Sequence, residues 1–143
     1  MALHILLAED DDDDYEMFMD AAVSVLPDIR IIRIADGTHL IEAVDEPGLN
    51  VPDMVFLDLN MPRKNGFDCL TAMRRSEDWK TVPVVIYSTS AHTDQVDQAW
   101  KSGANLYIRK PHDFLEIQRM LQKVFAMDMS GETARRDRFM FRA

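Results

Sequence analysis

The chain lacks several features that would place it in common classes of protein. It has a single cysteine, Cys69, among 143 residues, so no internal disulfide can form and a reducing compartment is expected. No apolar run approaches the roughly 20 residues that a membrane-spanning helix needs. The first residues also lack the basic region and cleavage site of a signal peptide. These absences predict a cytoplasmic protein.

Basic residues are scarce relative to acidic ones. The sequence holds 16 lysines and arginines against 25 aspartates and glutamates, which gives a formal net charge of -9 at pH 7. This balance argues against nucleic acid or an anionic membrane surface as the main partner. The length of 143 residues fits one domain with a full hydrophobic core.

The most informative stretch of the chain runs from Pro52 to Pro62. It contains an apolar run, Met54 to Leu57, and ends that run with one carboxylate, Asp58. A run of this length and composition, bounded by prolines, predicts a strand that is buried on both faces. Ligand sites in an open parallel sheet lie at the carboxyl ends of the strands. Asp58 is therefore the first candidate functional residue.

The rest of the chain alternates short apolar runs with segments of helical spacing. Five strands are predicted, each followed by a helix whose apolar residues recur every three or four positions. This alternation predicts an α/β domain with a doubly wound sheet. The predicted strands cover residues 5–8, 29–35, 53–58, 84–87 and 106–108, and the predicted helices begin near residues 13, 38, 67, 92 and 114.

Three local details of the helices are also predicted. Thr38 is placed as the cap of the second helix, and Phe114 is placed on the inward face of the fifth. The run Asp12 to Asp14 is interpreted as the solvated first turn of the first helix, where negative charge suits the helix dipole.

Right-handed crossovers place the carboxyl ends of all five strands at one edge of the sheet. This edge gathers Glu9, Asp10, Asp58, Ser88 and Lys110. Carboxylates that lie together repel, and their pKa values rise above the usual value of about 4. A divalent cation removes this conflict, and oxygen ligands suit Mg²⁺, which also leaves positions for a phosphate oxygen. We therefore expect a Mg²⁺ site at Glu9, Asp10 and Asp58.

Lys110 and Ser88 would complete a site for phosphoryl transfer. The lysine ammonium can pair with one phosphoryl oxygen, and a hydroxyl can donate to another. Asp58 would then be a nucleophile whose attack depends on screening by the metal and the lysine. The neighbouring residues Thr89 and Ser90 are alternative hydroxyl donors.

With four such motifs in order, the chain resembles the receiver domains of the two-component response regulator family. The resemblance covers about residues 3–127, and in detail it is similar to small stand-alone receivers that partner phytochrome-type and other sensor histidine kinases. It implies a flavodoxin-like fold with strand order 2-1-3-4-5 and five helices. The domain would span residues 1–127. The motifs are the acids at residues 9–11, the run at 57–62 with Asn65-Gly66 after it, the segment 83–88 and the segment 103–111.

The resemblance implies a role for each acidic residue of the site. Asp58 is expected to be the phosphoacceptor. Glu9 and Asp10 correspond to the acidic pair that holds Mg²⁺, with Asp10 as the more direct ligand. Asn60 is expected to lend its backbone carbonyl to the same ion.

The resemblance also implies a switch. Ser88 corresponds to the hydroxyl that moves toward the phosphoryl group, and Tyr107 to the aromatic residue that turns inward when it does. Lys110 corresponds to the family's lysine, and its peptide bond to Pro111 is expected to be cis, which proline makes accessible.

The implied function is that of a single-domain response regulator. It would take a phosphoryl group from a sensor histidine kinase and signal by contact with another protein or by onward phosphotransfer, without an enzymatic output of its own. Thr89 stands where the family usually has alanine or glycine, so a phosphate-independent binding module is the alternative. A metal-dependent phosphatase is disfavoured, because no general acid is evident.

The tail, residues 128–143, differs in composition from the domain. It holds four arginines and the aromatic run Phe139-Met140-Phe141. Two interpretations stay open at this stage, an arm that forms a homodimer and a frayed terminus.

Overall fold

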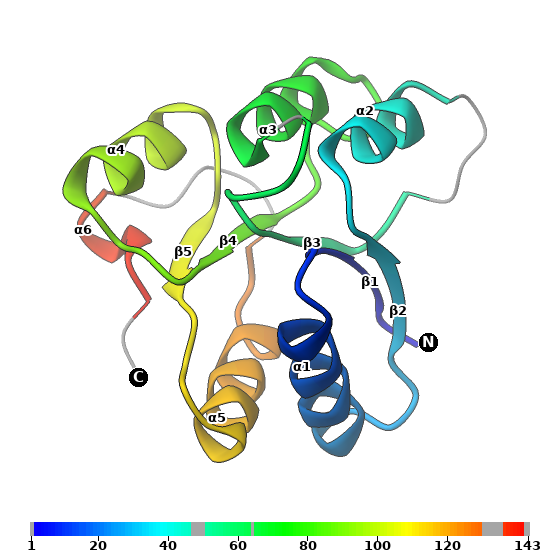
Figure 1. The fold of residues 1–143 in the computed structure, drawn as a ribbon, viewed down its shortest axis with the longest axis vertical. Helices are drawn as coiled ribbons and strands as arrows, with labels where there is room; N and C mark the ends of the chain where they lie inside the picture. The colour runs from blue at the N-terminus through cyan, green and yellow to red at the C-terminus, as the bar shows by residue number, and fades with distance from the viewer. Residues whose placement is uncertain (1, 47–50, 64, 130–135, 142–143) are drawn as a thin grey trace.

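A parallel five-stranded sheet forms the centre of the computed structural model, which describes residues 2–46, 51–63, 65–129 and 136–141. The strands lie in the order β2-β1-β3-β4-β5, as predicted (Figure 1). Strands β3 and β4 are buried along their whole length, which explains their continuous apolar runs. The strands are β1 (His4–Ala8), β2 (Arg30–Ile34), β3 (Met54–Leu57), β4 (Val84–Ser88) and β5 (Leu106–Arg109).

Helices cover both faces of the sheet (Figure 1). Helices α1 and α5 pack together on one face, and α2, α3 and α4 lie on the other. No helix in the described part of the chain is long and apolar enough to cross a membrane. The helices are α1 (Asp12–Val25), α2 (Gly37–Asp45), α3 (Gly66–Arg75), α4 (Thr93–Lys101), α5 (Phe114–Phe125) and a short α6 (Arg136–Phe139) in the tail.

The sheet separates two hydrophobic cores. One core joins β3 and β4 to α1 and α5, and in it Phe18 meets Phe56 edge to face with ring centroids 4.9 Å apart. The other core lies under α2, α3 and α4 and contains Leu40, Leu70 and Val96. This two-sided burial confirms the doubly wound fold and holds the carboxyl ends of the strands at one edge.

Two of the predicted local details are wrong. The cap of α2 is Asp36, whose carboxylate accepts a hydrogen bond from the Thr38 backbone N–H. Aspartate ranks above threonine as a cap, and the cap lies two residues earlier than expected. Phe114 is 40% exposed, although its spacing from the buried Ile117 is right. It is the first residue of α5, where the protein leaves much of the ring uncovered.

The tail packs against β5, which is an edge strand of the sheet. Met140 forms a parallel bridge with Tyr107, and the Phe141 backbone N–H donates to the Tyr107 carbonyl at 2.8 Å. Phe139 is fully buried and meets the Tyr107 ring edge to face, with centroids 6.2 Å apart. Residues 139–141 therefore cover backbone groups that an edge strand would otherwise present to solvent.

Candidate functional site

The site is built around Asp58, the residue that follows β3. Because Ala8 pairs with Leu57 in the parallel register, Glu9 and Asp58 leave adjacent strands side by side. The Asp58 backbone N–H donates to the Ala8 carbonyl at 3.0 Å, and the Asp58 Oδ1 atom accepts from the Asn60 backbone N–H at 2.9 Å. The carboxylate is thereby fixed at the sheet edge, where only 5% of the residue is exposed.

Lys110 reaches into the same site from the residue after β5. Its backbone N–H donates to the Ser88 carbonyl at 2.7 Å, which ties the ends of β4 and β5 together. Its Nζ atom lies 2.6 Å from Glu9 Oε1, 2.8 Å from Asp14 Oδ2 and 3.0 Å from Asp58 Oδ2. One buried ammonium group thus contacts three carboxylates.

This cluster holds three carboxyl groups against a single ammonium group. Burial, and then hydrogen bonding with Asp58, raises the pKa of the Glu9 carboxyl to about 8 against the opposing effect of Lys110. Burial alone would lower the pKa of Lys110. Its hydrogen bonds to Asp14 and Glu9 more than offset burial, so the pKa lies above its ordinary value. The ammonium therefore stays charged, while burial favours the protonated form of Glu9.

Three carboxylates of the cluster fit a divalent cation. One oxygen each from Glu9, Asp10 and Asp58 lies within 4.8 Å of the others, and Asp10 is exposed to solvent. Glu9 Oε1 is buried, and the Lys110 ammonium at 2.6 Å is its charged neighbour in the described part of the chain. Hard oxygen ligands of this kind suit Mg²⁺ or Mn²⁺. A cation would also favour the ionised form of Glu9 and so oppose the burial that raises its pKa.

The three hydroxyl residues after β4 lie in different surroundings. Ser88 is fully buried at the strand end, Thr89 is exposed, and Ser90 is half-buried and hydrogen-bonded through its side chain to Gln95. The Tyr107 hydroxyl donates to the Ser90 carbonyl at 2.8 Å. This arrangement favours Ser88 as the donor at the site, and it places Tyr107 inside the protein.

The interpretation of the acidic run as wholly solvated is wrong for Asp14. This residue lies in the first turn of α1 and pairs with Lys110, while Asp12 pairs with Arg33 at 2.8 Å and is 85% exposed at its side chain. Asp14 lies in the first turn of α1, directly after the acidic pair at the sheet edge, and this place in the chain is the signal that could have put it at the site.

The expectation of a cis bond between Lys110 and Pro111 is also wrong. No cis peptide bond occurs in the described part of the chain. Even before proline, the trans form is the more stable by roughly 0.5–1 kcal/mol. With the bond trans, the lysine ammonium still reaches Asp58 at 3.0 Å.

Gly66 lies directly against the site, although it was not among the predicted site residues. A Cβ atom at this position would fall 2.8 Å from the Asp58 carbonyl oxygen and 2.8 Å from the Leu59 Cα atom. Both are backbone atoms, so the close approach of α3 to the loop after β3 requires glycine. The turn signal of Asn65-Gly66 could have identified the position.

Known proteins share both this sequence pattern and this fold. The family described as the response regulator receiver domain matches residues 5–122. The probable methanogenesis regulatory protein FilR2 of Methanothrix harundinacea is 30% identical over 123 residues, which are 84% of this chain and 79% of that protein. Response regulator Rcp1 of Synechocystis sp. is 27% identical over 124 residues, 84% of each chain.

Two solved structures extend the comparison. The Mn²⁺-bound form of Rcp1 has a TM-score of 0.76 at 27% identity and covers 85% of this chain and 91% of its own. The bacteriophytochrome response regulator RtBRR has a TM-score of 0.71 at 27% identity and covers 87% and 77% of the two chains. The receiver-domain family matches most of the chain, and the strand order and the acidic cluster at the sheet edge agree with that match. The protein therefore belongs to the response regulator receiver family.

Proposed function

We propose that Asp58 accepts a phosphoryl group from the phosphohistidine of a sensor histidine kinase in a Mg²⁺-dependent reaction. The observation that carries the proposal is the convergence of Glu9, Asp10 and the Lys110 ammonium on one buried aspartate. In the transfer, an Asp58 carboxylate oxygen bonds to phosphorus. The bond from phosphorus to the donor nitrogen breaks, and its electron pair stays on that nitrogen.

Each residue of the site has a separate task in this reaction. Glu9, Asp10 and Asp58, with the Asn60 carbonyl, would hold Mg²⁺. The ion would supply charge neutralisation at the phosphoryl oxygens. Lys110, already 3.0 Å from Asp58, holds a positive charge where the phosphoryl group would arrive.

Ser88 completes the set as a hydroxyl donor to a second phosphoryl oxygen. Its burial excludes water from that side of the site. No group of the site is assigned to the hydrolysis of an external substrate, so the protein is proposed to be a phosphoacceptor and not a turnover enzyme.

The test is the intact mass of the full chain after incubation with acetyl phosphate, in Mg²⁺ and in EDTA. A single phosphoryl adduct is expected in Mg²⁺, none in EDTA and none in Asp58→Ala, because the nucleophile is then missing. Asp53→Ala is the matched control, since Asp53 lies before β3 and accepts a hydrogen bond from the His4 N–H at the far end of the strand. No adduct even with a cognate kinase would favour the phosphate-independent binding module.

The partners are part of the proposal. The likeness to RtBRR, described as a bacteriophytochrome response regulator, supports a phytochrome-type kinase as the donor. The output would be contact with a downstream protein or onward phosphotransfer. A homodimer through the tail would compete with the docking of residues 139–141 on β5 of the same chain, so in-chain docking is the arrangement proposed. A cytoplasmic location fits the free, buried Cys69.

Binding of Mg²⁺ is expected to depend on pH through Glu9. With a pKa of about 8, this carboxyl is protonated below pH 8, and the cation must displace the proton. The Mg²⁺ affinity should therefore fall by up to about tenfold per pH unit below pH 8 and level off above it. Titration calorimetry between pH 6 and 9 measures this slope. Glu9→Gln should bind more weakly at pH 9 and lose the slope, and an unchanged slope would assign the proton elsewhere.

A further inference from the structure

The tail holds Tyr107 from two sides. The Phe139 ring packs against the Tyr107 ring, and both residues are fully buried. The Tyr107 carbonyl accepts the hydrogen bond from the Phe141 N–H, next to the Met140 bridge. Because ring and backbone are both contacted, Tyr107 cannot leave its inward position without disturbing residues 139–141.

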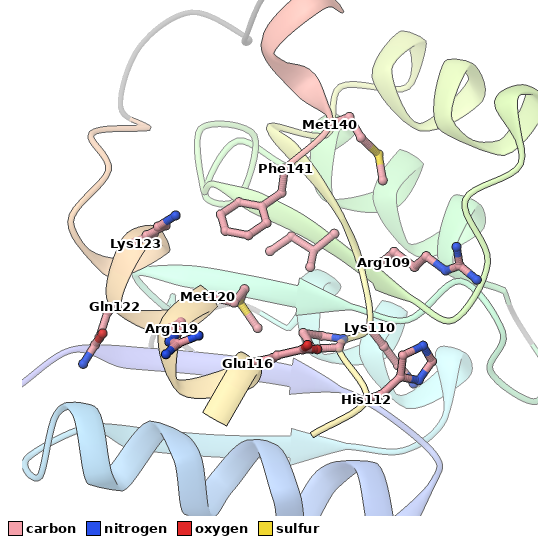
Figure 2. Close-up of a pocket in the computed structure, with 12 residues that line it drawn as sticks. Arg109, Lys110, His112, Glu116, Arg119, Met120, Gln122, Lys123, Met140 and Phe141 are labelled. Carbon is pink, nitrogen blue, oxygen red and sulfur yellow. The ribbon is translucent and has the colours of Figure 1, made fainter. Parts of the chain in front are cut away.

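The docked tail joins the two faces of the sheet. Phe139 belongs to the core under α2, α3 and α4, and Met140 packs against it, whereas Phe141 packs against the core of α1 and α5. Figure 2 shows Phe141 and Met140 along one side of a pocket, with Met120 and Lys123 of α5 on another. The pocket measures about 680 Å³. The tail thus forms part of the surface beside β5, and its release would change that surface.

A short chain of contacts leads from Tyr107 to the phosphoryl site. The Tyr107 hydroxyl donates to the Ser90 carbonyl at 2.8 Å, and the Ser90 N–H donates to Ser88 Oγ at 3.3 Å. The Ser88 carbonyl in turn accepts from Lys110, whose ammonium contacts Asp58. The position of Tyr107 is therefore linked to the residues that would meet a phosphoryl group.

We propose that residues 136–141 act as an internal ligand of β5, whose docking is coupled through Tyr107 to the phosphorylation of Asp58. The inference rests on the proposed function. A phosphoryl group at Asp58 adds oxygen acceptors for the Ser88 hydroxyl. Because Ser88 Oγ also accepts from the Ser90 N–H, a Ser88 side chain held by the phosphoryl group holds the Ser90 backbone too. The Ser90 carbonyl is thereby fixed against the Tyr107 hydroxyl. A fixed Tyr107 gives Phe139 a fixed surface, and docking of the tail becomes stronger.

The coupling has a reciprocal consequence. If phosphorylation strengthens tail docking by some factor, then docking strengthens the phosphorylated state by the same factor. A downstream protein that binds the edge of β5 must displace residues 139–141. The docked tail therefore lowers the affinity of that partner for β5, and phosphorylation of Asp58 lowers this affinity further.

The experiment is hydrogen exchange of the full chain with and without Mg²⁺ and beryllium fluoride, a phosphoryl mimic, read at the Phe141 amide. Exchange should slow by at least about fivefold with the mimic, the lower end of the usual range for coupled sites. Phe139→Ala should remove this slowing, and Asp58→Ala should do the same. Phe114→Ala is the matched control, because Phe114 is exposed at the start of α5.

The readouts separate the possible failures. Separate wild-type samples without beryllium fluoride are treated with acetyl phosphate in Mg²⁺ and weighed, and absence of an adduct there overturns the proposed function and this inference together. An adduct that forms while Phe141 exchange stays unchanged overturns only the coupling. Protection that increases with protein concentration would show that the tail docks on a second copy, and would overturn docking within one chain.

Discussion

Replacing Lys110 by alanine is expected to slow phosphorylation of Asp58 by at least about 100-fold, as the loss of one preorganised donor does at other charged transition states. The ammonium is the cation that pairs with both Glu9 and Asp58 in the described part of the chain. Without it, charge that develops on the phosphoryl oxygens has one fewer partner. Adduct formation with acetyl phosphate in saturating Mg²⁺, followed by mass against time, measures the rate.

The same substitution is expected to make the stability of the protein depend more strongly on bound Mg²⁺. In EDTA, Lys110→Ala should lose about 3 kcal/mol of unfolding free energy, the lower end for breaking a buried pair, because burial already favours the uncharged form of Glu9. Mg²⁺ should recover most of this loss, since the ion supplies the missing positive charge. The rise in Tm on adding Mg²⁺ should therefore be larger in the variant than in the wild type.

A surface lysine is the matched control for this experiment. Lys80 pairs with Glu77 at 2.8 Å, but its side chain is 48% exposed. Lys80→Ala should change stability by no more than about 0.5 kcal/mol and leave the phosphorylation rate unchanged. Equal losses for Lys110→Ala in Mg²⁺ and in EDTA would show that the lysine contributes by packing and not by charge.

Replacing Arg74 by alanine is expected to cost about 3 kcal/mol of stability, because several acceptors, most of them partly buried, lose their donor together. The half-buried guanidinium extends from α3 and donates to the Gly103 and Val82 carbonyls and to Asn105 Oδ1, each at 2.9 Å. It also donates to the Lys80 carbonyl at 3.1 Å. This one side chain ties α3 to the segments that enter β4 and β5.

Urea denaturation followed by circular dichroism measures the effect, and a neighbour on the same helix provides the control. Arg75 is exposed, so Arg75→Ala should stay within about 0.5 kcal/mol of the wild type. Arg74→Lys should recover less than half of the loss, because an ammonium cannot spread its donors over separated acceptors. Full recovery by lysine would mean that charge, and not the fork of the guanidinium, provides the stability.

The sequence by itself determined the strand and helix order and most of the acidic cluster. Continuous apolar runs, such as Met54 to Leu57, indicate strands buried on both faces, and crossovers of one hand then bring Glu9, Asp58 and Lys110 to one edge. These predictions depend on local pattern and on chain topology. Both can be worked out before any side chain is placed.

The tertiary structure alone decided which side chains pair across the site and what covers β5. Asp14 meets Lys110 across 96 residues of sequence, and Phe139 packs on Tyr107 from the far end of the chain. The trans bond before Pro111 and the exposure of Phe114 were decided there as well. Such contacts depend on distances between elements to within about 1 Å, because ion pairs and ring packing fall off steeply with separation, and sequence spacing carries no information at that scale.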